Sequence, residues 1–166
     1  MPTNLPHPLR PADVRLLTEI GFVAAAAGMQ QQALRVFNGL SVLRPHRAFP
    51  YIGQATTHLN AGEHEQAEQA LRRGRLQLDE EARVEPGTEL LIEDRALLAA
   101  FHGLALQLGQ RNTEAARALS DALSLQADGP AARMACAMLG LPMPAPKQKA
   151  MPEAPPATLI PAGSPS

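Results

Sequence analysis

The chain has 166 residues, of which 45% are apolar, 19% charged and 3% aromatic, enough for one ordinary domain with its own core but not for a second full domain. Fifteen basic and sixteen acidic side chains leave a formal net charge of -1, so we do not expect the broad cationic surface that binds nucleic acid or an anionic membrane. One cysteine, Cys136, cannot form an internal disulfide, and five scattered histidines show no metal-ligand spacing, so no metal or cofactor is expected.

The prolines divide the chain into a middle section and two arms. Their number, 16, is about twice the usual share of roughly 5%, and most of them lie within residues 1–11 and 142–166. Proline interrupts helices, and the C-terminal arm has few bulky apolar side chains to bury in return for the entropy of ordering. We therefore predict a disordered arm over 1–11, a helical domain over 12–141 and a disordered proline-rich tail over 142–166.

The middle section is expected to be all-α. The predicted helices cover residues 12–27, 30–43, 48–61, 64–78, 88–108, 112–126 and 130–140. The last begins with Pro130 at a first-turn position behind Asp128, a residue type that caps helix N-termini, and should close the end of the array. The apolar run 20–29 has the outline of a secretory signal. Acidic residues, Asp13 and Glu19, lie in the segment before the run, and the run belongs to a repeat, so we do not expect a signal peptide.

That repeat has a period of 34 residues. The shift relates Leu17 to Tyr51, Ala27 to Ala61, Gly28 to Gly62, Ala33 to Ala67 and Phe37 to Leu71. A third, looser copy follows a 14-residue insertion and carries Gly103, Leu106, Gly109, Ala115, Leu119 and Ala122. Thirty-four residues is the period of the tetratricopeptide repeat, and the order of small and large residues in the first unit is similar to the pattern of that family.

The resemblance implies a right-handed superhelix of about three antiparallel helix pairs plus a C-terminal capping helix. Small residues such as Gly21, Ala33 and Ala55 should lie where the two helices of a pair approach closely. Gly28 and Gly62 should end the first helix of each pair in the left-handed conformation. Each pair leaves an apolar face open, so stacking on the next pair completes the core.

Residues 79–94 form an acidic insert between the second and third units. This segment contains seven acidic residues, one basic residue, Arg83, and the turn-forming residues Pro86 and Gly87. We interpret this segment as a solvated loop followed by an exposed helix start, where carboxylates suit the helix dipole.

The family's groove positions fall on the first helix of each pair. Transferred to this chain, they are Arg15, Thr18, Phe22, Ala25 and Ala26 in the first unit, Phe49, Ile52, Thr56, Leu59 and Asn60 in the second, and Leu97, Ala100, Leu104, Gln107 and Leu108 in the third. Because these positions are mostly apolar, they favour a partner that exposes hydrophobic side chains, and they argue against a carboxylate clamp. Phe22, Ile52 and Leu59 are the expected anchors.

Two stretches, Ala33–Leu43 and Phe49–Ala55, are similar to the first two repeats of bacterial type III secretion chaperones. The resemblance spans roughly residues 14–125 and implies a cytoplasmic chaperone that holds a secreted protein until export. The client would be a translocator or a needle or filament subunit, and the sequence leaves both open. It also leaves open a homodimer or a co-chaperone complex.

No catalytic motif accompanies the repeats, so we do not expect an enzyme. His64-Glu65 lacks the second histidine that a zinc-protease helix requires, and Cys136 lies among apolar residues as a buried hydrophobe would. The alternative is a tetratricopeptide scaffold component of a secretion apparatus or another multiprotein assembly, located in the periplasm if it is exported.

Overall fold

The computed structural model describes residues 9–143, and within that range the chain forms seven α-helices and no strand, as an all-α fold requires. The helices are α1 (Pro11–Ala26), α2 (Gln30–Leu43), α3 (Phe49–Asn60), α4 (His64–Val84), α5 (Glu89–Leu108), α6 (Asn112–Leu125) and α7 (Pro130–Leu139). Six of them match the predicted ranges to within one residue at either end. The predicted disorder of the two arms falls almost entirely outside the described residues.

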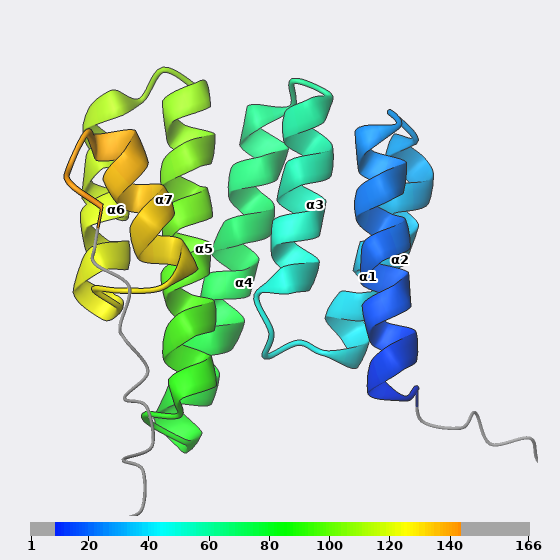
Figure 1. The fold of residues 1–166 in the computed structure, drawn as a ribbon. Helices are drawn as coiled ribbons and strands as arrows, with labels where there is room; N and C mark the ends of the chain where they lie inside the picture. Colours follow the sequence, from blue (N-terminus) through cyan, green and yellow to red (C-terminus); the bar gives the residue numbers. More distant parts are fainter. Residues whose placement is uncertain (1–8, 144–166) are drawn as a thin grey trace, which may run out of the picture.

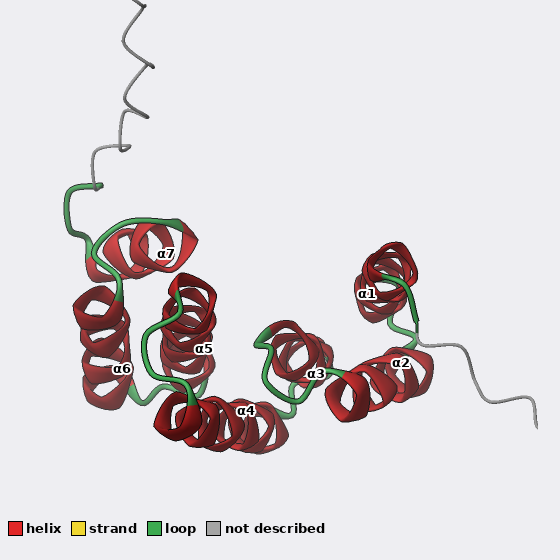
Figure 2. Cartoon of the chain, turned by 90° about the horizontal axis from the view of Figure 1, so that it is seen from below, coloured by secondary structure: helices red, strands yellow, loops and turns green. Residues whose placement is uncertain are grey.

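Consecutive helices form three antiparallel pairs, α1/α2, α3/α4 and α5/α6, which stand side by side in Figure 1. Figure 2 shows that the pairs follow an arc, with α1, α3 and α5 on its inner side and α2, α4 and α6 on its outer side. The final helix, α7, packs against both α5 and α6 and continues the curve. The inner helices therefore share one surface.

Glycine allows the paired helices to approach closely. A Cβ added at Gly21 would lie 2.7 Å from the Phe37 ring, and one added at Gly103 would lie 2.6 Å from Leu119. These two glycines occupy equivalent positions in the first and third pairs, opposite equivalent large side chains. The predicted alternation of small and large residues is confirmed in the buried contacts of both pairs.

The turns inside the pairs use the left-handed conformation. Gly28 and Gly62 have φ angles of 73° and 75°, as the repeat predicted. In the third pair the corresponding residue is Gln110, with a φ of 63°. A non-glycine side chain in this region carries a conformational cost, so the third turn departs from the first two.

The solvated loop that we expected in the acidic insert is confined to the exposed residues 85–88, before an exposed start of α5. Helix α4 continues through residues 79–84 to Val84, so the insertion lengthens the α4/α5 hairpin, whose turn projects beyond the neighbouring helices in Figure 1. Several of the acidic side chains have partners. Asp79 accepts from Arg95 Nε at 3.0 Å, and a Glu81 oxygen lies 3.2 Å from His46 Nδ1.

Asp94 is the most buried of these carboxylates, with 4% of its surface exposed. Its Oδ2 accepts from Arg47 Nε at 2.6 Å and from the backbone N–H of Ala48 at 3.1 Å. Ala48 is the N-cap residue of α3 and has no side chain that can cap the helix. A side chain of α5 therefore supplies the cap of α3 from 46 residues away.

The start of α7 also differs from the prediction. The N-cap position is held by Gly129, with a φ of 100°, rather than by Asp128, and no side chain caps the helix there. Glycine is suited to this position because a residue with a Cβ would be strained at that φ. Pro130 occupies the first turn as predicted.

Candidate functional site

The predicted partner-binding residues lie on α1, α3 and α5, the inner helices of Figure 2, and differ widely in exposure. Arg15, Ala26 and Asn60 are exposed; Thr18, Phe22, Phe49, Thr56, Leu59, Leu97 and Leu104 are half-buried; Ala25 and Ile52 are buried. Of the three further positions in the third unit, Gln107 and Leu108 are exposed and Ala100 is buried.

Ala25, Ile52 and Ala100 are therefore corrections to the predicted surface. Ala25 is 3% exposed within the core of the first pair, and Ile52, an expected anchor, is 7% exposed within the core of the second. Ala100 is fully buried in a cluster that includes residues of α7. Neighbouring helices cover all three, so none of them offers its side chain to a partner.

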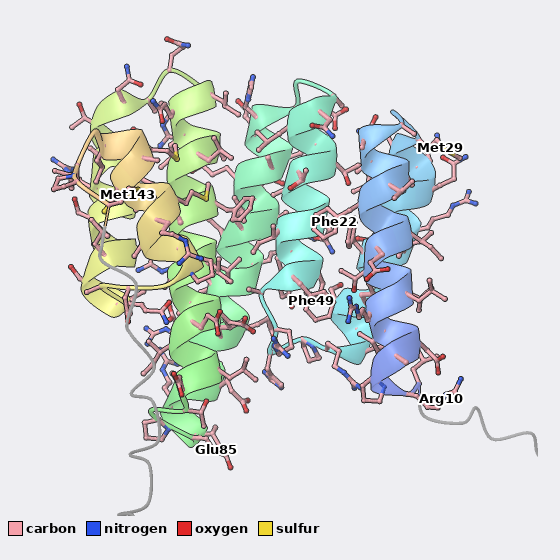
Figure 3. The ribbon with its side chains drawn as sticks, viewed as in Figure 1. Arg10, Phe22, Met29, Phe49, Glu85 and Met143 are labelled. Atoms are coloured by element: carbon pink, nitrogen blue, oxygen red, sulfur yellow. The ribbon has the colours of Figure 1, made fainter. Side chains whose placement is uncertain are left out.

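Phe22 and Phe49 line the space between α1 and α3 in Figure 3. The Phe22 ring meets Phe37 edge-on, with centroids 5.0 Å apart, and packs against the cores of both the first and the second pair. The Arg47 guanidinium lies 5.8 Å from the centroid of the Phe49 ring. Both phenylalanines join the pairs and leave part of each ring accessible.

The apolar surface extends along α5. Leu97 and Leu104 are half-buried, while Leu90 and Leu108, at the two ends of the helix, are 49% and 48% exposed. With half-buried Phe101, these residues follow a helical spacing of seven, four, three and four, which places them on one face of α5. Leu90 and Phe101 were not among the predicted residues, although the same spacing would have identified them.

Three polar members of the set already have partners within the protein. The Asn60 amide donates to the carbonyl oxygen of Ala25 at 3.1 Å and so ties α3 to the end of α1. The Thr18 hydroxyl donates to the Val14 carbonyl, and Arg15 forms an exposed ion pair with Glu19 at 2.9 Å. The contacts that this surface leaves open are therefore chiefly apolar.

The described hollows lie elsewhere. One opens between α2 and α4 on the outer side, one between α4 and α6, and one at the end where α4 begins and α5 finishes. None of the predicted partner-binding residues lines any of the three. These three hollows are therefore separate from the predicted binding surface.

A charged cluster joins α4, α5 and the start of α6. Glu68 pairs with Arg72 and with Arg111, the latter at 2.6 Å, and its Oε1 lies 3.5 Å from His102 Nε2. That nitrogen is buried without a hydrogen-bond partner. Burial lowers the pKa of His102, against the opposing effect of Glu68. Burial also disfavours ionised Glu68, but the two arginines outweigh it and its pKa is lowered.

Metal chemistry has no evident site in the described residues, where no group of three His, Cys, Asp or Glu side chains could hold an ion. Cys136 is buried and unpaired. No helix in residues 9–143 combines the length and apolar character needed to cross a bilayer.

No model of a known protein family, no curated protein and no solved structure matches the chain.

Proposed function

We propose that this protein is a chaperone that binds a segment of another polypeptide on the inner face of a helical-repeat array. The observation that carries the proposal is the apolar stripe of α5, where Leu90 and Leu108 are about half exposed beside half-buried Leu97, Phe101 and Leu104. Together with Phe22 and Phe49 it forms an apolar surface across the three inner helices. Exposed apolar surface of this kind marks an interaction site.

The array is proposed to be a right-handed superhelix of the tetratricopeptide type. Support comes from the 34-residue equivalences, from the close approach of Gly21 to Phe37 and of Gly103 to Leu119, and from the left-handed turns at Gly28 and Gly62. In such arrays the inner helices present a concave surface to a helical or extended peptide.

The client is proposed to be a type III secretion substrate, held in the cytoplasm as a translocator or a needle or filament subunit. This step rests on the resemblance of Ala33–Leu43 and Phe49–Ala55 to chaperones of that system. An apolar surface suits a client whose hydrophobic segment would otherwise associate with other copies before export.

Co-expression with the proteins encoded beside it tests the proposal. We expect one small secreted protein to become soluble and to copurify in a stoichiometric complex. The double variant Leu104→Asp with Leu108→Asp should abolish copurification, because charges would have to be buried against the client. Phe22 and Leu59 are poorer targets, since both pack against the cores and a charge at either position would also destabilise the fold.

The matched control is Val84→Asp, which alters an aliphatic residue that is 73% exposed at the end of α4, an outer helix. It should leave the complex intact, and circular dichroism should show all variants folded. Copurification that survives the α5 double variant would contradict the binding surface. Fractionation with a large assembly, and with no single client, would instead favour the scaffold alternative.

A further inference from the structure

A second surface lies on the outer side of the arc, in a hollow of about 560 Å³ between α2 and α4. Its rim carries two of the most exposed aliphatic residues of the described chain, Val42 and Leu76, which are 81% and 69% exposed. They are separated by one 34-residue repeat, so they occupy the same position in successive pairs and face the hollow from either side.

The floor of the hollow is polar and fixed in place. The Tyr51 hydroxyl donates to the Pro45 carbonyl at 3.0 Å. The buried Gln54 amide donates to the Phe37 carbonyl at 3.5 Å and accepts from Arg73 Nη2 at 3.2 Å. These bonds hold the floor in its present arrangement before any ligand arrives.

Positive charge at the hollow has no acidic partner. Arg73 makes no ion pair in the described residues, and its bond to Gln54 uses one of the five N–H donors of a guanidinium. Arg35 lies seven residues before Val42, on the same face of α2, is exposed and also lacks a carboxylate partner within the described range. Helix α2 itself contains no acidic residue.

The equivalent hollow between α4 and α6 differs both in its charge balance and in the aliphatic residues of its rim. Its two arginines both pair with Asp79, which lies 2.9 Å from Arg95 and 3.7 Å from Arg75, and a second carboxylate, Asp121, also lines the hollow. The position of Leu76 is taken there by Ser124, 48 residues later. Exposed aliphatic side chains and uncompensated positive charge therefore coincide at the α2/α4 hollow and not at its neighbour.

We propose that the α2/α4 hollow binds an acidic peptide segment of a partner protein. An aliphatic side chain of the segment inserts between Val42 and Leu76, and a carboxylate one or two residues away pairs with the Arg73 guanidinium. Arginine suits this role because its planar fork binds a carboxylate through two parallel hydrogen bonds. The site lies between outer helices, so it is independent of the client surface on α1, α3 and α5.

A random dodecapeptide library displayed on phage and selected against the full chain tests the site. Enriched peptides should place Asp or Glu near Leu, Ile, Val or Met. Measured by fluorescence polarisation, their affinity should fall at least tenfold for Arg73→Gln and for Val42→Ser with Leu76→Ser. It should stay within twofold for Arg117→Gln, the control at an exposed arginine of α6, and for the inner-face variant Leu104→Asp with Leu108→Asp.

The site would be overturned by the absence of enriched peptides, by enriched peptides without acidic residues, or by acidic peptides that bind Arg73→Gln as tightly as the unaltered chain. Peptides that lose affinity only for the inner-face variant would also overturn it, while supporting the proposed client surface. Thermal melting of each variant identifies any loss of affinity that comes from unfolding. If Arg73→Gln unfolds, the affinity of the peptides for Arg73→Lys is measured instead, because lysine keeps the positive charge but lacks the planar guanidinium. An intermediate affinity is expected for Arg73→Lys, and an unchanged one would count against recognition by the fork.

Discussion

The junction between the α1/α2 and α3/α4 pairs is built from aromatic rings and hydrogen bonds, whereas the junction between α3/α4 and α5/α6 adds ion pairs. At the first, Phe37 packs on the backbone of Gly53, and Asn60 donates to the Ala25 carbonyl. No ion pair crosses it within the described residues. At the second, Asp94 binds Arg47 and Asp79 binds Arg95. One junction is specified by shape and the other by charge.

The difference predicts which changes each junction tolerates. Closely packed rings leave no volume for an added methyl group, so the first junction should respond to side-chain size and little to pH. Charged groups that leave water need their partners, so the second should respond to neutralisation and to acid.

The largest effect is expected from Gly53→Ala. The added Cβ would lie 2.2 Å from a Phe37 ring atom, so the ring or the helices must move. Overpacking costs about 1–3 kcal/mol, and three ring atoms would lie within 2.4 Å of the new Cβ, so we expect the free energy of unfolding measured in urea to fall by about 3 kcal/mol. Gly39→Ala is the control, because its Cβ would meet nothing within 4 Å, and it should stabilise α2 by about 0.5–1 kcal/mol.

Phe37→Leu sharpens this test. Leucine stands at the equivalent positions 71 and 119, and its smaller side chain leaves room beside residue 53. The double variant should therefore lose less stability than the two single variants together. Strictly additive losses would show that the contact between residue 53 and the ring is not what limits the first junction.

The second effect is expected from Asp94→Ala, which removes the partner of Arg47 and the cap of α3 at once. Breaking a buried pair from one side costs about 3–5 kcal/mol, but the Arg47 side chain is 38% exposed and can regain water, so we expect about 2 kcal/mol. Asp121→Ala, at an exposed carboxylate of α6, serves as the control. An equal loss of stability in both variants would contradict the charge-specified junction.

The smallest effect is a dependence of stability on pH. The pKa of His102 is lowered chiefly by burial, so the folded protein binds its proton more weakly than the unfolded chain does. Stability should fall as the pH drops below the ordinary histidine value of about 6.5. The lowered pKa of Glu68 adds a further loss below the ordinary glutamate pKa of 4.5, where the unfolded chain takes up a proton on that carboxylate before the folded protein does.

Urea unfolding at pH 7.5 and 5.5 measures the histidine contribution separately. His102→Gln removes the titrating group and should show a smaller loss between the two pH values than the unaltered chain. The Gly53→Ala variant should keep the full dependence, since the first junction contains neither group. A dependence that His102→Gln leaves unchanged would assign the effect to other histidines.

Much of this fold follows from the period of the sequence. The predicted ranges of six helices agree with the structure to within a residue, and the 34-residue spacing identified Gly28 and Gly62 by their left-handed conformation. Gly21 was identified by the close approach of the paired helices. Local patterns suffice for such features because helix ends and close approaches depend on residues near in sequence. The exposed stripe on α5 was only partly identified, because the insertion obscures the alignment of the third unit.

The acidic insert shows why other features could not be predicted. Asp79, Glu81 and Asp94 have the composition of a solvated segment, yet their partners are Arg95, His46 and Arg47, which the fold brings together from up to 47 residues away. The burial of Ile52 also depends on distant parts of the chain, since helices remote in sequence cover that face of α3. Neither effect leaves a local signature.

The cap that Asp94 provides has a consequence for how the molecule unfolds. In a linear array each unit contacts only its neighbours, so units can fray from either end while the rest stays folded. Here the first turn of a central helix is completed by a residue from the following unit, and opening that unit withdraws the cap. The two units should therefore melt together, as one cooperative block, rather than in succession.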